Sequence, residues 1–291
     1  MQQSKTKTVL TLKSLQEEIV TKTGTPIFQT NQSGIAFDPI RNRVFISTRW
    51  SAESGWYQTE PNSEIVGDFN RLTYSPTVDW EMNMSVRGRN LYLKDSTLRA
   101  STAWSRIAIK NLDTEIENNV GTYEYQYFDK TNRDTGNRAM IVDDNQDIWV
   151  GEDLSGQSIL RKVVPVTNPS PTNLMTIPGD YIELQVRVFS QLRGSVVDII
   201  GTRALTWYNG SVWGIDANNN LLVELTVEDI AGSNNKRAVI SDNIIELPSD
   251  ITYIGDIARG SNCWYIAGSD GSQRMTGSQM RDIFWIWTVL D

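Results

Sequence analysis

The stretch Tyr208–Val227, YNGSVWGIDANNNLLVELTV, alternates short apolar runs with clusters of turn residues. Asn209-Gly210 is a strong short signal for a two-residue hairpin turn, and the Asn run that ends at Asn220 favours a second turn. A similar order of turn, apolar strand, turn and apolar strand recurs at Asp143–Val163, DDNQDIWVGEDLSGQSILRKV, with almost no sequence identity. The recurrence predicts a repeated supersecondary unit.

The same unit can be traced five times along the chain. Each copy has a cluster of turn formers followed by a short apolar run with an aromatic residue in its middle, and a β-prone run on either side. Four antiparallel strands per unit is the blade of a β-propeller, and the spacing of the copies is close to that of propeller repeats. The five central aromatic residues, of which the tryptophans in particular are expected in the core, are Phe45, Tyr92, Trp149, Trp213 and Trp264.

The sequence therefore predicts an all-β fold, a β-propeller of five four-stranded blades closed by pairing of the N- and C-terminal strands. The last unit supplies three strands, and the missing strand is expected within residues 7–13, where Thr8–Leu12 reads TVLTL. A six-bladed propeller is also possible, because residues 181–200 hold an extra pair of β-prone runs. A β-sandwich or two small β domains are the alternative folds. The expected single domain covers residues 1–291, with blades around 33–75, 76–130, 137–190, 195–248 and 250–291.

Composition excludes several classes of protein. The chain has 27 basic and 35 acidic residues and a formal net charge of -8, which argues against a nucleic-acid partner. Neither a signal-peptide core nor an apolar run of membrane-spanning length is present, so we expect cytoplasmic synthesis and no membrane partner. The single cysteine, Cys263, lies in the apolar string CWYIAG and is expected to be a buried thiol.

The residues of common catalytic and cofactor sites are missing. Because the chain has no histidine, histidine-dependent catalysis is excluded. No phosphate-binding loop, dinucleotide fingerprint or nucleophile elbow is found, so no cofactor is predicted. Two strings with alternating oxygen side chains, which begin at Asp143 and Asp216, lack the glycine and glutamate of a calcium loop. They are interpreted as tight turns, and no metal site is predicted.

An enzyme without histidine could use paired carboxylates, as glycoside hydrolases do. In a four-stranded blade, the loop after the second strand and the loop before the first lie on the same face, and acidic residues occur there. Tryptophans in or near loops could stack on sugars or anchor a protein interface. The alternative is that these acids are solvated turn residues and the tryptophans are half-buried packing. The candidate rim contacts are Asp95, Glu152, Asp153, Asp216, Asp270, Trp50, Trp56 and Trp104.

Two segments carry a resemblance to a known family. GIAFDPIRNRVFIST at Gly34–Thr48 and RGRNLYLKDS at Arg87–Ser96 each have an inner strand, a polar turn and an apolar strand. In this they resemble the propellers of bacteriophage tail proteins, particularly the nozzle proteins of short-tailed phages. The resemblance implies a non-enzymatic virion component of the tail or neck, assembled with other protein subunits and as a homo-oligomer. The alternative function is a propeller that binds or hydrolyses carbohydrate, with a glycan at the rim carboxylates.

Overall fold

The computed structural model describes residues 5–9, 34–48, 55–59, 61–62, 65–66, 70–71, 81–95, 104–113, 124–129, 139–154, 156–199, 204–216, 218–276 and 279–290. Within these ranges nearly all regular structure is β-strand, and no helix is long and apolar enough to cross a membrane. For part of the strand residues only the backbone is described.

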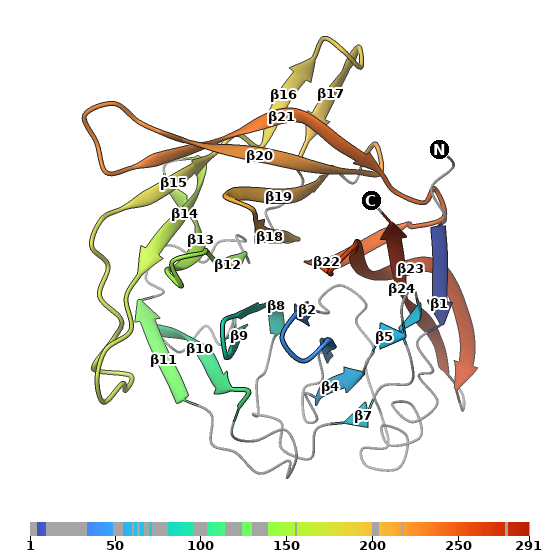
Figure 1. Cartoon of the computed structure of the whole chain (residues 1–291), viewed down its shortest axis with the longest axis horizontal. Coiled ribbons are helices and arrows are strands. Elements are labelled where there is room, and N and C mark those ends of the chain that lie inside the picture. The colour runs from blue at the N-terminus through green and yellow to red at the C-terminus, as the bar shows by residue number, and fades with distance from the viewer. Residues whose placement is uncertain are drawn as a thin grey trace.

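The described strands group into five four-stranded antiparallel units, which we call blades 1 to 5 (Figure 1). Blade 1 has β2 (Ile35–Asp38), β3 (Arg43–Thr48), β4 (Gly55–Thr59) and β7 (Asn70–Arg71). Blade 2 has β8 (Glu81–Arg87), β9 (Asn90–Asp95), β10 (Trp104–Asn111) and β11 (Glu124–Asp129). Blade 3 has β12 (Met140–Val142), β13 (Ile148–Leu154), β14 (Gln157–Val163) and β15 (Tyr181–Leu184). Blade 4 has β18 (Leu205–Tyr208), β19 (Ser211–Asp216), β20 (Leu221–Asp229) and β21 (Lys236–Glu246).

Blade 5 is completed by the start of the chain. It consists of β22 (Tyr253–Arg259), β23 (Cys263–Thr276), β24 (Gln279–Leu290) and β1 (Lys5–Val9). Strand β1 pairs antiparallel with β24, from Lys5 opposite Val289 to Val9 opposite Trp285. The predicted closure of the fold by its two ends is confirmed, although the pairing strand begins earlier than the run at Thr8–Leu12.

The five innermost strands surround a common axis. Strands β2, β8, β12, β18 and β22 each contact the next one around the ring, and β22 also contacts β2. Blades that radiate from such a hub are the defining feature of a β-propeller, so the predicted fold class is confirmed.

Hydrophobic clusters fill the spaces between neighbouring blades. One cluster lies between blades 1 and 2, another between blades 2 and 3, and two more between blades 3 and 4 and blades 4 and 5. The central aromatic residues belong to these clusters, and Trp213 and Trp264 have ring centroids 4.8 Å apart. All five are buried, and the prediction that Trp149, Trp213 and Trp264 lie in the core is confirmed.

Blades 3 and 4 are joined into one eight-stranded sheet. Their outer strands β15 and β21 pair in parallel, with Ile182 opposite Lys236 and Leu184 opposite Ala238. The extra β-prone pair that left a sixth blade open is divided between β15 and a separate hairpin of β16 (Arg187–Ser190) and β17 (Ser195–Asp198). A second small hairpin, β5 (Pro61–Asn62) and β6 (Ile65–Val66), lies beside blade 5.

A glycine allows the close approach of β22 and β23. Strand β23 passes β22 at a bulge between Ile254 and Asp256, and a Cβ on Gly268 would lie 2.2 Å from the carbonyl oxygen of Tyr253. We expect Gly268→Ala to lower the free energy of unfolding by about 1–3 kcal/mol, because the backbone must move to accept a methyl group. Urea unfolding would measure this change.

The matched control is Gly214→Ala in β19. Its Cβ would meet the methyl ends of Leu205 and Ile199, at 2.9 and 3.0 Å, which can shift more easily than a backbone carbonyl. The loss should therefore be smaller than for Gly268→Ala. Equal losses for the two variants would show that the approach of β22 and β23 is not a tight constraint.

Candidate functional site

The predicted rim acid Glu152 is held within its own blade. It lies at the end of β13, is buried, and forms an ion pair with Arg161 on the neighbouring strand β14. A second hydrogen bond, from Arg161 Nη2 to Glu152 Oε1, measures 3.3 Å. The carboxylate of Glu152 therefore neutralises a half-buried guanidinium on the adjacent strand.

Asp216 supports the turn that follows β19. Its Oδ1 accepts hydrogen bonds from the backbone amides of Asn218 and Asn219, at 3.1 and 3.3 Å, and its Oδ2 accepts one from the Asn219 side chain at 2.6 Å. The side chain of Asp216 is fully buried. This is the turn chemistry that aspartate and asparagine supply in tight loops.

The other predicted rim residues are not brought into a described cluster. Asp270 is half-buried in β23. Asp95 and Asp153 lie at the ends of β9 and β13, and Trp56 and Trp104 lie in β4 and β10. Only the backbone of these four residues is described. Trp50 lies outside the described residues. A carboxylate pair at the rim therefore remains a prediction.

The string that begins at Asp143 also forms a turn. Asp143 Oδ1 accepts the backbone amides of Asn145 and Asp147, at 2.9 and 3.0 Å, and its Oδ2 accepts the indole N–H of Trp149 at 2.9 Å. Among the residues described here, no three acids or cysteines gather in a way that could hold a metal ion.

A cavity lies in the hub, near the ends of the inner strands where they turn into the second strands. Its volume is about 160 Å³, and it is lined by residues of β2, β8, β18 and β22 with the turns that follow β2 and β22. Aromatic and guanidinium groups are prominent in the lining, and the described lining residues include no Asp or Glu. The side chains that matter for recognition are Phe37, Arg87, Trp207, Tyr208 and Arg259.

Arg87 of β8 connects its own strand to the inner strands β12 and β18 beside this cavity. Its Nε donates to the carbonyl oxygen of Val142 at 2.9 Å, and its Nη2 donates to the carbonyl oxygen of Trp207. Asp144 lies 3.6 Å from Nη1 and also accepts the indole N–H of Trp207 at 2.9 Å. Burial lowers the pKa of the Arg87 guanidinium, and the charges of Asp144 and Asp143 oppose this effect.

Arg259 lies against two aromatic rings. Its guanidinium carbon is 4.6 Å from the ring centroid of Tyr208 and 5.1 Å from that of Trp264, and its Nη1 donates to the carbonyl oxygen of Cys263 at 3.4 Å. The rings hold the guanidinium in place by cation–π attraction. Cys263 itself is buried, as predicted.

An acidic group is buried in the hub beneath the cavity. Asp256 of β22 is inaccessible to solvent, and each of its carboxylate oxygens accepts two hydrogen bonds. Oδ1 accepts the Asn83 side-chain amide at 2.8 Å and the Ile257 backbone amide at 2.9 Å. Oδ2 accepts the backbone amides of Ile35 at 3.1 Å and Met84 at 3.4 Å. Strands β2, β8 and β22 are thus tied together by one carboxylate.

Asn83 extends this connection to a fourth inner strand. Its side-chain oxygen accepts the backbone amide of Met140 in β12 at 2.7 Å, while its side-chain nitrogen donates to Asp256. Burial raises the pKa of Asp256 well above its ordinary value, and the four N–H donors act in the opposite direction. The Asp256–Asn83 pair satisfies backbone groups that would otherwise face the hub unpaired.

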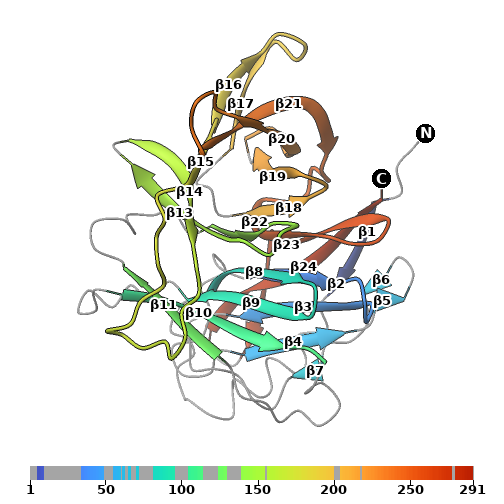
Figure 2. The ribbon, with the colours of Figure 1, turned by 60° about the vertical axis from the view of Figure 1, so that its left-hand side comes forward.

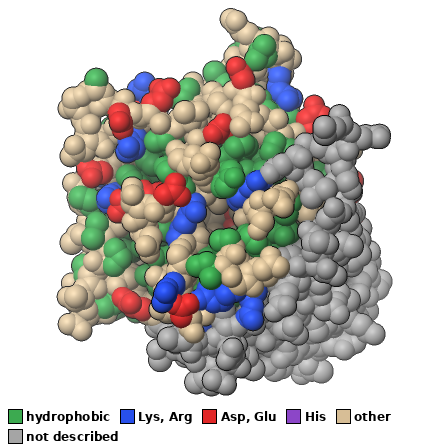
Figure 3. Space-filling model, viewed as in Figure 1, with side chains coloured by type: hydrophobic (Ala, Val, Ile, Leu, Met, Phe, Trp, Pro, Cys, Tyr) green, Lys and Arg blue, Asp and Glu red, His purple; other side chains and the backbone are tan. Residues whose placement is uncertain are grey.

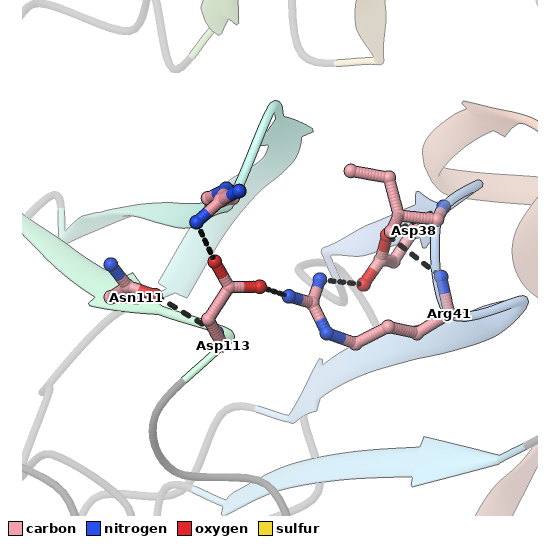
Figure 4. Close-up of polar contacts among 6 residues, drawn as sticks. Asp38, Arg41, Asn111 and Asp113 are labelled. Carbon is pink, nitrogen blue, oxygen red and sulfur yellow. Dashed lines mark hydrogen bonds and ion pairs between the residues drawn. The ribbon is translucent and has the colours of Figure 1, made fainter.

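Five more charged and polar side chains connect blades 1 and 2 near the cavity (Figure 4). Arg41 lies between two carboxylates, with Nη1 2.8 Å from Asp38 and Nη2 bonded to Asp113. Arg89 donates to the other oxygen of Asp113 at 2.8 Å, and Asn111 accepts the Asp113 backbone amide at 2.8 Å. Lys and Arg side chains also gather near the middle of the molecular face shown in Figure 3.

The cavity and the predicted rim acids lie at opposite ends of the blades. Tyr208 lines the cavity at the end of β18, whereas Asp216 lies at the far end of the next strand, because β19 runs antiparallel from Ser211 to Asp216. Converging groups were predicted at the acid end, and the cavity was not predicted. The signal available was an Arg at the end of two inner strands, Arg87 and Arg259.

Comparisons with known proteins support the fold. No protein-family model matches the chain, and no curated protein sequence matches it. A solved structure named glucose dehydrogenase superposes with a TM-score of 0.50 at 12% identity, covering 89% of this chain and 96% of that one. A GH43_1 enzyme from Xanthomonas citri complexed with xylose gives a TM-score of 0.48 at 11% identity, with 91% and 89% covered. A putative oxidoreductase (glucose dehydrogenase) from Thermus thermophilus gives 0.46 at 10% identity, with 91% and 99% covered.

These matches correct one prediction. The expected role as a non-enzymatic virion component was wrong, because the solved structure that superposes with a TM-score of 0.50 is named glucose dehydrogenase. At 12% identity the similarity establishes the fold alone, and the chain is a β-propeller of the kind found in these enzymes.

Proposed function

We propose that this propeller binds a monosaccharide-sized carbohydrate that carries a carboxylate, in the cavity of the hub. The observation that carries the proposal is the lining of this cavity, in which two guanidinium groups and three aromatic side chains converge without a described acid. A ligand pocket with a mostly apolar wall and a few oriented polar groups is the usual form of a small-molecule site.

The size of the cavity favours one ring. A protein cavity of about 150 Å³ holds a single benzene molecule, and the hub cavity has a similar volume of about 160 Å³. Trp207 is half-buried with its indole N–H fixed by Asp144, so its ring is held in one orientation. A fixed aromatic face is a suitable platform for the C–H face of a sugar.

The charge of the cavity favours an acid. Guanidinium groups recognise carboxylates through paired N–H donors, and Arg87 and Arg259 both contribute to the lining. The bonds of Arg87 to Val142, Trp207 and Asp144 leave part of its five N–H donors for a ligand. Hydrolysis by two carboxylates is not part of the proposal, because Glu152 and Asp216 already bind groups of their own blades.

Binding of glucuronic or galacturonic acid, measured by titration calorimetry and by saturation-transfer NMR, tests the proposal. We expect the uronic acids to bind more tightly than glucose, and their affinity to fall with added salt while that of glucose does not. Trp207→Ala should weaken binding about tenfold or more, since it removes the ring platform.

Two variants serve as controls. Trp207→Phe keeps an aromatic face but loses the bond to Asp144, and it should retain most of the affinity. Glu152→Gln lies at the opposite end of the blades and should leave the affinity unchanged. Failure of uronic acids to bind at millimolar concentration, or equal affinity in the Trp207→Ala variant, would exclude this site.

A further inference from the structure

A hairpin of strands β16 and β17 projects from the propeller beside blade 4 (Figures 1 and 2). Its inner side packs on the core through Val197, which is fully buried, and Val188. Its outer side and tip expose Phe189, Leu192 and Val196, which are 59%, 78% and 37% accessible. Three of the five large apolar side chains that the described residues expose are therefore on this hairpin.

The hydrogen-bond pattern shows which backbone groups the hairpin leaves unpaired. The amide of Ile199 donates to the carbonyl oxygen of Val186 at 2.7 Å, so bonded residue pairs follow at every second position of the antiparallel ladder. Residues of the alternate pairs, Arg187 opposite Asp198 and Phe189 opposite Val196, direct their N–H and C=O groups away from the partner strand.

The two outer edges of the hairpin differ. On β17 the outward carbonyl oxygen of Val196 accepts a hydrogen bond from the Asn219 side chain at 3.1 Å, so blade 4 contacts this edge. Strand β16 pairs with β17 alone among the described strands. The backbone groups of Arg187 and Phe189 therefore form a free edge, of the kind that accepts another strand.

We propose that this edge pairs with the same edge of a second copy of the chain, giving a two-fold symmetric dimer through a four-stranded sheet. A two-fold axis at Val188 places Arg187 of each copy opposite Phe189 of the other. Both residues direct their backbone groups outward, so each of these pairs exchanges both of its hydrogen bonds. The dimer thus uses every outward group of the free edge.

The side chains fit the same register. Arg187 and Phe189 lie on the same face of the strand, because they are two residues apart. Arg187 is 70% exposed, and its Nε is 4.0 Å from Asp198, so the guanidinium is not firmly held within the hairpin. In the dimer, the Arg187 side chain of each copy lies beside the Phe189 ring of the other copy. This cross-strand pair forms a cation–π contact and covers the exposed ring. The edge is therefore self-complementary in both its backbone groups and its side chains.

Sedimentation velocity over a concentration series tests the dimer. For the unaltered chain we expect the mass to rise from 32.9 kDa towards twice that value. Phe189→Pro removes the outward N–H donor and the ring, and proline is tolerated on an edge strand. This variant should stay monomeric and keep the thermal unfolding temperature of the unaltered monomer.

A charge pair tests the register even if the proline variant fails to fold. Phe189→Lys places a cation opposite the second copy's Arg187 and should weaken the dimer about tenfold or more, whereas Phe189→Glu places an anion there and should retain a salt-sensitive dimer. Leu192→Ser, at the tip, should leave association unchanged. A chain that is monomeric at every concentration, equal effects of lysine and glutamate, or a loss on Leu192→Ser as large as that of Phe189→Lys would overturn the proposal.

Discussion

Replacing Asp256 by asparagine is expected to lower the free energy of unfolding by about 2–6 kcal/mol, because two buried N–H donors lose their acceptor at about 1–3 kcal/mol each. In either orientation the new NH₂ group would face two donors. It would meet the amides of Ile35 and Met84 in place of Oδ2, or those of Asn83 and Ile257 in place of Oδ1. Urea unfolding, followed by tryptophan fluorescence, would measure the loss.

The control is Asp229→Asn on the surface of blade 4. Asp229 is 84% exposed and forms a surface ion pair with Lys236 on the neighbouring strand β21. Its replacement should therefore change the free energy of unfolding by about 0.5 kcal/mol or less. A loss below about 1 kcal/mol for Asp256→Asn would show that the hub does not depend on this carboxylate.

The stability difference between the unaltered chain and Asp256→Asn should depend on pH in one direction. Because burial raises the folded-state pKa of Asp256 above its ordinary value of 3.8, the folded chain holds this proton to higher pH than the unfolded chain. The stability that the group contributes is therefore fully present below about pH 4 and declines as the pH rises through the folded-state pKa. The difference in stability between the unaltered chain and Asp256→Asn should shrink over that range.

The regular part of the fold could be predicted from the sequence because its signals are local. Turn residues such as Asn209-Gly210 both adopt positive φ, 52° and 79°, and set the hairpin by their own backbone preferences. The aromatic residue that follows each turn then falls on a strand that packs between two blades, as Trp149 and Trp213 do. Five repeats of this pattern are sufficient to indicate the propeller.

The hub could not be predicted in the same way, because it joins residues that are far apart in the chain. Asp256 and Asn83 are separated by 173 positions, and each lies at a register shift in its strand pairing. A sequence pattern gives no register for such bulges. The available sign was a carboxylate inside the apolar run Ile254–Ala258, which a solvated turn residue would not occupy.

The roles of the acidic residues at strand ends could not be predicted from the sequence for a different reason. Aspartate after a strand is expected both for a rim of ligand contacts and for a turn that needs side-chain acceptors. Asp216 proves to serve its turn, and Glu152 proves to pair with Arg161, but both roles use the same residue types at the same positions. Only the hydrogen-bond partners distinguish them, and these depend on which strand lies alongside.

Deletion of residues 1–9 is expected to have the second large effect, since it removes β1 from blade 5. Strand β1 pairs with β24 from Lys5 opposite Val289 to Val9 opposite Trp285, and this ladder closes the ring. The loss of about five ladder hydrogen bonds, at about 0.5–1.5 kcal/mol each, should lower the free energy of unfolding by roughly 3–7 kcal/mol. Strand β24 would then carry an unpaired edge, which promotes aggregation.

A strand supplied in trans separates closure of the ring from any general effect of truncation. A synthetic peptide of residues 1–13 should bind the truncated chain and raise its urea midpoint, because it binds the folded form and restores the pairing with β24. A peptide of the same composition in scrambled order should do so much less, since it loses the residue order that sets the register with β24. If the truncated chain unfolded at the same urea concentration as the full chain, the pairing of the two ends would not be needed for stability, and the contacts of β22 with β2 and β18 would be sufficient to hold blade 5 in the ring.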